Sequence, residues 1–171
     1  MSDAELNIKS VADLLKAITD RNIEYVDFIF TDLRGKQQHT TQHVDTVDKD
    51  LLTDGVFFDG SSIAGWKAIN ESDMVLMPDV NRVTIDPFTA QPTLKIFCDI
   101  YDPVTKKPYV RDPRSIAKRA EAYLKASGLG DTAYFGPEPE FFIFDGVEWS
   151  VDMSGCALKI HSAEAAWGSG E

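Results

Sequence analysis

The sequence predicts an α+β fold, in which a small mixed β-sheet with one or two helices is followed by a second region containing both helix and strand. Three observations predict this class. Short segments rich in β-branched and aromatic residues recur between residues 25 and 101, and turn residues separate them. Residues 11–20 and 113–128 instead place apolar side chains three and four positions apart, which is the spacing of an amphipathic helix. A polar stretch with two prolines, over residues 102–108, is the expected boundary between the two regions.

A helix and a hairpin are expected before residue 45. Ser10 is the predicted N-cap of a helix over residues 11–20, because a serine side chain can accept a hydrogen bond from the first helical turn. Residues 25–32 carry apolar side chains on one face and predict a strand. A turn around Gly35 then leads into residues 37–43, which we interpret as the polar return strand of a hairpin.

The remaining elements of the first region are short. Thr46 is the predicted cap of a brief helix that closes near Gly55. Residues 57–73 combine glycines, serines and aromatic residues without a period, so we expect an ordered loop there. Further strand candidates, broken by prolines, are residues 74–77, 83–85 and 93–101.

The second region begins with a clearly delimited helix. Asp112 is its predicted N-cap, Pro113 suits the first helical position, and Gly128 suits the C-terminal end. The apolar stripe of this helix comprises Ile116, Ala120, Tyr123 and Leu124. Strand candidates follow the helix at residues 133–135, 138–144 and 156–160.

The composition restricts the expected partners and compartment. The chain has 171 residues, with 28 acidic and 17 basic side chains and a formal net charge of −11. Such an acidic protein repels phosphate backbones, so we expect no nucleic-acid partner. Its apolar runs fall short of the ~20 residues that span a bilayer, and its acidic N-terminus is unlike a secretory signal, so we expect no membrane association. Two cysteines, Cys98 and Cys156, form no disulfide framework, which favours a cytoplasmic location.

Glu138 and Glu140 form the most unusual pair of charges. Residues two apart on a strand point to the same face, which would bring both carboxylates side by side. Such a pair is costly unless a cation neutralises it, and Mg²⁺ or Mn²⁺ is the natural partner of oxygen ligands. The alternative is an edge strand whose acidic side chains simply face water. Only three histidines are present, so a metal site built from this chain alone would lack ligands.

The loop over residues 57–73 is the second candidate site. Asp59, Ser61 and Ser62 could bind something small there, although an ordinary turn stabilised by Asp and Ser side chains explains the same residues. Trp66 in this loop is either a local plug or an exposed interface anchor. The chain has no P-loop motif and no dinucleotide-binding glycine motif in a strand-to-helix context.

Three sequence blocks occur in a characteristic order. They are Phe58-Asp59-Gly60-Ser61-Ser62-Ile63-Ala64-Gly65-Trp66, then Asn70-Glu71-Ser72-Asp73-Met74, then Gly136-Pro137-Glu138-Pro139-Glu140-Phe141-Phe142. Together they resemble the N-terminal portion of bacterial-type glutamine synthetases, and the resemblance extends over nearly the whole chain. It implies a β-grasp-like N-terminal domain over residues 1–103, followed by the start of the family's catalytic α+β domain over residues 104–171.

The resemblance also implies an activity and its residues. Family members make glutamine from glutamate, ammonium and ATP through a γ-glutamyl phosphate, with two Mg²⁺ or Mn²⁺ ions per site. By this resemblance Glu138 holds the ion that binds the ATP phosphates, and thus belongs to the nucleotide site, while Glu140 holds the ion that binds glutamate. Asp59 matches the catalytic aspartate of the ammonium site, with Ser62 close by.

The family's assembly is implied in the same way. Its members form homo-oligomers, usually dodecamers of two stacked hexameric rings, in which a neighbouring subunit completes the ammonium site. Trp66 and Asp73 match positions at that subunit boundary.

Three functional hypotheses remain open. The first is a glutamine synthetase segment that does not turn over alone, because the other metal ligands, the substrate-binding arginines and the adenine pocket are missing from it. The second is a non-catalytic β-grasp module with a binding or regulatory role. The third is an unrelated metal-dependent enzyme built on Glu138 and Glu140. Under the first, we expect roughly the first 100 residues to fold autonomously and those beyond about 110 to self-associate, rearrange or be poorly ordered, because unpaired strands expose edges.

Overall fold

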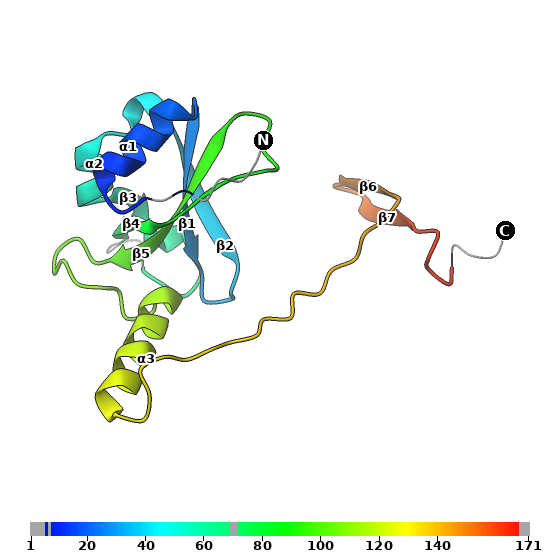
Figure 1. Ribbon diagram of the computed structural model, residues 1–171. Helices are drawn as coiled ribbons and strands as arrows, with labels where there is room; N and C mark the ends of the chain where they lie inside the picture. Colours follow the sequence, from blue (N-terminus) through cyan, green and yellow to red (C-terminus); the bar gives the residue numbers. More distant parts are fainter. Residues whose placement is uncertain (1–5, 7, 69–71, 168–171) are drawn as a thin grey trace. The chain divides into compact units, whose positions relative to one another are not determined.

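The computed structural model describes residues 6, 8–68 and 72–167. The chain divides into two compact units, of which the first ends at Ala133 and the second begins at Tyr134 (Figure 1). Both helix and sheet are present, so the predicted α+β class is confirmed.

The first unit is built on a five-stranded sheet with the strand order β2-β1-β5-β4-β3 (Figure 1). The strands are β1 (Tyr25–Thr31), β2 (Gln37–His43), β3 (Val56–Asp59), β4 (Asp73–Ile85) and β5 (Thr93–Tyr101). β1 runs parallel to β5, while all other neighbours in the sheet are antiparallel. The sheet is therefore mixed, as the sequence predicts.

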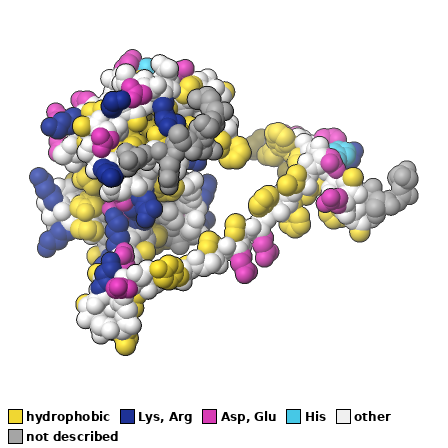
Figure 2. Space-filling model, in the orientation of Figure 1, with side chains coloured by type: hydrophobic (Ala, Val, Ile, Leu, Met, Phe, Trp, Pro, Cys, Tyr) yellow, Lys and Arg dark blue, Asp and Glu magenta, His cyan; other side chains and the backbone are white. Residues whose placement is uncertain are grey.

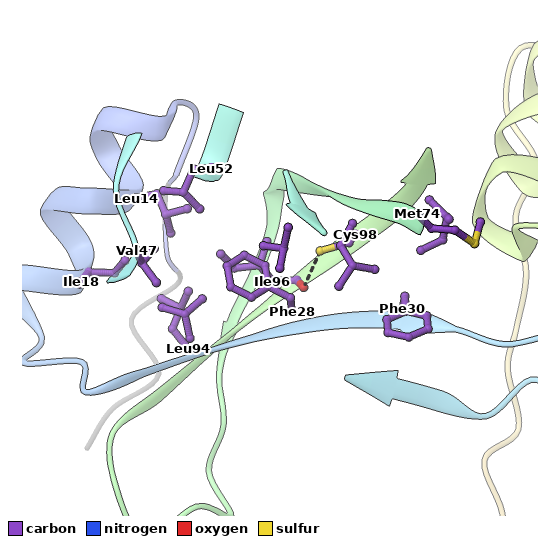
Figure 3. Packing of buried hydrophobic residues seen from close by; sticks show 14 of the residues in the cluster. Leu14, Ile18, Phe28, Phe30, Val47, Leu52, Met74, Leu94, Ile96 and Cys98 are labelled. Carbon is purple, nitrogen blue, oxygen red and sulfur yellow. Dashed lines mark hydrogen bonds between the residues drawn. The ribbon is translucent and has the colours of Figure 1, made fainter. Parts of the chain in front are cut away.

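Two helices cover one face of this sheet. They are α1 (Val11–Asp20) and α2 (Lys49–Asp54), and the same unit contains two short 3₁₀ turns, η1 (Val44–Thr46) and η2 (Gly60–Ser62). Leu14 of α1 and Leu52 of α2 pack into one core with Phe28 of β1 and Ile96 of β5 (Figure 3). The alternation of the strands explains this core, because every second side chain faces the helices.

The third helix, α3 (Pro113–Ser127), follows the sheet and belongs to the first unit. Its predicted ends are confirmed: the carboxylate of Asp112 accepts hydrogen bonds from the first turn, Pro113 occupies the first position, and Gly128 takes a left-handed conformation with φ 71°. Asp112 is fully buried and also accepts a hydrogen bond from the backbone of Ile100, at 3.3 Å. The start of α3 is thus fixed to β5.

The sheet contacts α3 through charged side chains. Arg114 Nε lies 2.9 Å from Asp99 Oδ1, and its Nη2 pairs with Asp79. Lys118 pairs with Asp99 as well. The predicted apolar stripe of α3 does not make this contact with the sheet: Ile116 is 46% exposed and Tyr123 is 76% exposed. Within the described part of the chain, the apolar side of this helix therefore has little covering.

The second unit contains a single described hairpin of β6 (Gly146–Asp152) and β7 (Gly155–His161). Asp152 stabilises its tight turn, because its carboxylate accepts hydrogen bonds from the backbone of Ser154 at 2.7 Å and of Gly155 at 3.2 Å. Residues 132–144, which precede the hairpin, have no regular structure, and hydrophobic side chains are exposed along them (Figure 2).

Several sequence predictions need correction. Asp48, and not Thr46, is the N-cap of α2, since its carboxylate accepts from the backbone of Leu51. Part of the expected loop over 57–73 is strand β3, and the candidates 74–77 and 83–85 are one strand, β4, with an irregularity between Pro78 and Val83. The strands predicted at 133–135 and 138–144 are wrong, because no described strand pairs with them. The strand at 156–160 is confirmed as part of β7, and its partner β6 was not predicted.

Candidate functional site

Asp59 lies where β3 ends and η2 begins. It is the last residue of β3, paired in register with Asp73 of β4, and it is also the N-cap of η2. The next residue, Gly60, donates a backbone hydrogen bond to the carbonyl of Ser72 at 2.7 Å. A Cβ atom on Gly60 would lie 2.3 Å from the Met74 sulfur, so any other residue here would require the Met74 side chain or the backbone to shift.

The carboxylate of Asp59 is held by its own loop. Its Oδ1 accepts hydrogen bonds from the Ser61 hydroxyl at 2.6 Å and from the Ser61 backbone N–H at 2.8 Å. Both bonds stabilise the charged form and therefore lower the pKa of Asp59 below its ordinary value. The bond from the Ser61 hydroxyl has the larger effect. The side chain is exposed, so the loop presents a fixed negative charge to solvent.

Ser62 shares the η2 turn with Asp59 and is exposed. The structure therefore brings the two predicted ammonium-site residues into one turn. Both interpretations of the loop agree with this geometry: it is a turn stabilised by Asp and Ser side chains, and it also displays an ionised carboxylate beside a hydroxyl.

Trp66 lies in the core and not on the surface. Its side chain is 4% exposed and contacts the rings of Phe30, Phe58 and Tyr109, with centroid distances of 5.7, 6.2 and 5.7 Å. The local-plug interpretation is thus confirmed, and the exposed anchor is wrong for the described chain. Asp73 is exposed at the start of β4. A role of Trp66 and Asp73 at a subunit boundary stays a prediction.

The far end of this loop is tied to the segment that precedes α3. We define residues 59–67 as the Asp59 loop. The Tyr109 hydroxyl donates to the Trp66 carbonyl at 2.7 Å, and Arg111 Nη1 donates to the Gly65 carbonyl at 2.5 Å. Lys67 Nζ lies 3.4 Å from Asp102 Oδ2 and 5.7 Å from the centre of the Tyr109 ring. The sequence gives no sign of these contacts, because an isolated tyrosine in a polar stretch does not reveal a partner 43 positions away.

Glu138 and Glu140 lie in the second unit, within the irregular segment, and both are exposed. Two carboxylates supply only part of the roughly six oxygens that Mg²⁺ requires. Among the described residues no group of three or more His, Cys, Asp and Glu side chains could hold a metal ion. Carboxylate oxygens are suitable ligands for a divalent cation, so Glu138 and Glu140 could form part of such a site. The other ligands would have to come from residues other than those described.

Among the residues described, none of the helices combines the length and the apolar character that crossing a bilayer requires.

Comparison with known families gives two adjoining matches. Residues 22–103 match the family described as glutamine synthetase, beta-Grasp domain, and residues 110–169 match that described as glutamine synthetase, catalytic domain. The β-grasp interpretation of the first sheet is thereby confirmed.

Similar proteins agree with these matches. A glutamine synthetase of Methylococcus capsulatus is 56% identical over 157 residues, and that of Azospirillum brasilense is 54% identical over 163 residues. A protein of Cupriavidus pinatubonensis named 3-hydroxylaminophenol mutase is 60% identical over 163 residues. The matches cover 92%, 95% and 95% of this chain, but only 34%, 34% and 35% of those proteins, so the chain spans about a third of their length.

The fold has a solved counterpart as well. The glutamine synthetase of Plasmodium falciparum superposes with a TM-score of 0.70 at 26% identity, over 91% of this chain and 30% of that one. Two family matches in the expected order, relatives above 50% identity and this shared fold lead to one conclusion: the chain belongs to the glutamine synthetase family.

Proposed function

We propose that this chain supplies the ammonium-site loop and part of the metal site of an ATP-dependent glutamate–ammonia ligase. The observation that carries the proposal is the Asp59 carboxylate, which the Ser61 bonds hold ionised and exposed at the start of η2. Glutamine synthetases are ligases, and the sequence blocks around Asp59 and Glu138 resemble theirs.

In this proposal Asp59 acts mainly through its charge. Because hydrogen bonds lower its pKa, the carboxylate is a weak base but stays anionic at neutral pH. It therefore suits attraction and orientation of the ammonium cation. Ser62 would add a hydroxyl oxygen beside it.

Glu138 and Glu140 would each hold one Mg²⁺ or Mn²⁺ ion, Glu138 toward the ATP phosphates and Glu140 toward glutamate. Bound there, the two ions would neutralise charge between anionic reactants during phosphoryl transfer. The exposed position of both carboxylates leaves them accessible to ions and to further ligands from outside this chain.

We further propose that the complete protein is a homo-oligomer, a dodecamer of two hexameric rings, and works in the cytoplasm. A neighbouring subunit would complete the Asp59 site, with Asp73 near the boundary. This is compatible with an Asp59 loop whose exposed side carries the charge while its aromatic side faces the core. Sedimentation of the complete protein tests the assembly, and a monomer would contradict it.

The activity is tested by coupled ADP release. The complete protein containing this segment should release ADP only when glutamate and ammonium are both present, and Asp59→Asn should abolish most of that rate. Asp50→Asn, at an exposed position in the first turn of α2, makes the same change of charge and should leave the rate unchanged. The 171-residue chain alone should show no such activity, and glutamate- and ammonium-dependent turnover by it would contradict this part.

A non-catalytic β-grasp binding or regulatory module is the alternative. It would gain support if the natural polypeptide had the intact mass of 171 residues and bound no divalent cation. Titration with Mn²⁺, compared between the complete protein and Glu140→Gln, distinguishes the two.

A second activity has one observation in its favour, the 60% identity to the protein named 3-hydroxylaminophenol mutase. The complete protein should then consume 3-hydroxylaminophenol. No loss of this compound, in a preparation that makes glutamine, would exclude that activity.

A further inference from the structure

We infer that Tyr109 and Arg111 are positioning residues for the ammonium site, because they brace the Asp59 loop from the segment that leads into α3. The inference rests on the proposed function and deepens it. Neither residue is assigned to touch substrate, and both would act through the backbone of the loop.

The side chains of Tyr109 and Arg111, which we call the brace, hold two consecutive carbonyl groups of the loop. Tyr109 donates its hydroxyl to the Trp66 carbonyl at 2.7 Å, and Arg111 donates to the Gly65 carbonyl at 2.5 Å. Tyr109 is only 9% exposed, so its bond is sheltered from water, and losing it leaves a buried carbonyl without this donor. Arg111 is exposed, and its bond competes with water. Tyr109 is therefore the stronger of the two.

The brace is itself fixed to the most buried part of the sheet. The backbone N–H of Tyr109 donates to the carbonyl of Ile100 on β5 at 2.8 Å, and the backbone N–H of Ile100 donates to Asp112. Ile100 and Asp112 are fully buried. The tail of the loop is thus attached to β5 through the buried residues Tyr109 and Asp112.

The other end of the loop is fixed independently. Asp59 is paired to β4, and Gly60 is bonded to the carbonyl of Ser72. Within the loop, Ile63 donates to the Gly60 carbonyl at 3.2 Å and Trp66 donates to the Ile63 carbonyl at 3.1 Å. A constraint at Trp66 therefore reaches Ser62 through two successive turns.

A small cation is bound well only where its ligands are held in one geometry before it arrives. With the brace released, Asp59 would keep its Ser61 bonds but Ser62 would lose its fixed position. We therefore expect a loss that falls on ammonium and not on ATP or glutamate.

The first test uses the 171-residue chain. Tyr109→Phe removes one hydroxyl and retains the ring that contacts Trp66 and Lys67. The backbone amides of Ile63 and Trp66 should exchange with solvent about tenfold faster, as loss of one sheltered hydrogen bond implies, while those of β5 keep their rates. Tyr25→Phe on β1 is the matched control and should leave the exchange rates of both the loop amides and the β5 amides unchanged. Equal exchange in Tyr109→Phe and wild type would overturn the brace.

The second test uses the complete protein. Tyr109→Phe should raise the KM for ammonium about tenfold and leave the KM values for glutamate and ATP and the kcat near wild type. Arg111→Gln should do the same to a smaller extent, and Arg111→Lys should recover part of the loss. Equal changes in all three KM values would mean a purely structural role and overturn the inference. A complete wild-type protein that makes no glutamine would contradict the proposed function. The hydrogen-exchange result would still show whether Tyr109 holds the Asp59 loop.

Discussion

Arg114 Nε lies 2.9 Å from Asp99 Oδ1, and the same guanidinium also reaches Asp79. One side chain of α3 is thus joined to two strands, since Asp99 lies on β5 and Asp79 on β4. This contact explains why α3 belongs to the first unit although its sequence matches the catalytic domain of the family. The planar guanidinium of Arg114 donates hydrogen bonds from separate nitrogens to the two carboxylates. A lysine, with a single nitrogen, could not reproduce this geometry.

Replacing this residue should therefore destabilise the first unit. We expect Arg114→Met to lower the free energy of unfolding by about 2 kcal/mol, between the values for surface and for buried pairs, because Lys118 still partners Asp99. Urea unfolding followed by circular dichroism measures it. Lys125→Met, which removes an exposed pair with Glu121, should cost far less, because water screens that pair. Equal losses in the two variants would show that Arg114 does not fix the helix.

Gly60→Ala tests the close packing beneath the Asp59 loop. The added Cβ would lie 2.3 Å from the Met74 sulfur and 2.7 Å from its Cγ, so the loop or the core must shift. We expect a loss of about 1–3 kcal/mol in unfolding free energy, as for other overpacked cores. Gly136→Ala meets nothing within 4 Å and should leave the melting temperature unchanged. A fully stable Gly60→Ala would mean that the backbone is not held against Met74.

Ser61→Ala should raise the pKa of Asp59 toward its ordinary value. The hydroxyl is the largest cause of the lowered pKa, and the backbone N–H bond would remain, so the return should be partial. Carboxyl ¹³C chemical shifts measured against pH report it. The control is Ser154→Ala, which should raise the pKa of Asp152 by the same mechanism and leave that of Asp59 where it was.

The same substitution has a signed effect on stability. A carboxylate whose pKa is lower in the folded than in the unfolded chain stabilises the fold above its unfolded pKa, and this contribution is lost as pH falls through the folded value. Ser61→Ala should therefore be less stable than wild type at neutral pH, and the two should converge in acid. A difference that grew in acid would contradict the assignment.

The apolar stripe of α3 should matter little to this chain. Ile116 and Tyr123 are 46% and 76% exposed, so Ile116→Gln and Tyr123→Gln should each change the unfolding free energy by less than about 0.5 kcal/mol. Thermal unfolding tests this. In the complete protein we expect the same variants to be clearly destabilising, because an apolar stripe at helical spacing is typical of a covered face.

The irregular segment before β6 should drive self-association. Phe141 and Phe142 are exposed in a stretch without regular structure, and exposed apolar runs of this kind promote contact between copies. The replacement of both by serine should lower the concentration dependence of the sedimentation coefficient. Replacement of Val104 and Phe88, exposed side chains of the first unit, should have less effect.

Local features could be predicted wherever a few neighbouring residues decide them. Ser10, Asp112, Pro113 and Gly128 set the ends of α1 and α3, because capping depends on side chains within three positions of the helix end. The three sequence blocks around Asp59 and Glu138 were equally sufficient to predict the family. The strand-like segments and the two helical stripes predicted the fold class and the β1–β2 hairpin, but not the order of the other strands.

The tertiary structure decided everything that depends on a distant partner. Trp66 is a plug because Phe30 and Tyr109 close around it, and neither is near it in sequence. The predicted strand at 138–144 has the right composition, yet it lacks a described neighbour and stays irregular, because a strand is stabilised by the edge it pairs with. The sequence by itself thus determined the caps of α1 and α3, the core residues of β1 and the family, while long-range burial and pairing determined how the Asp59 loop is held.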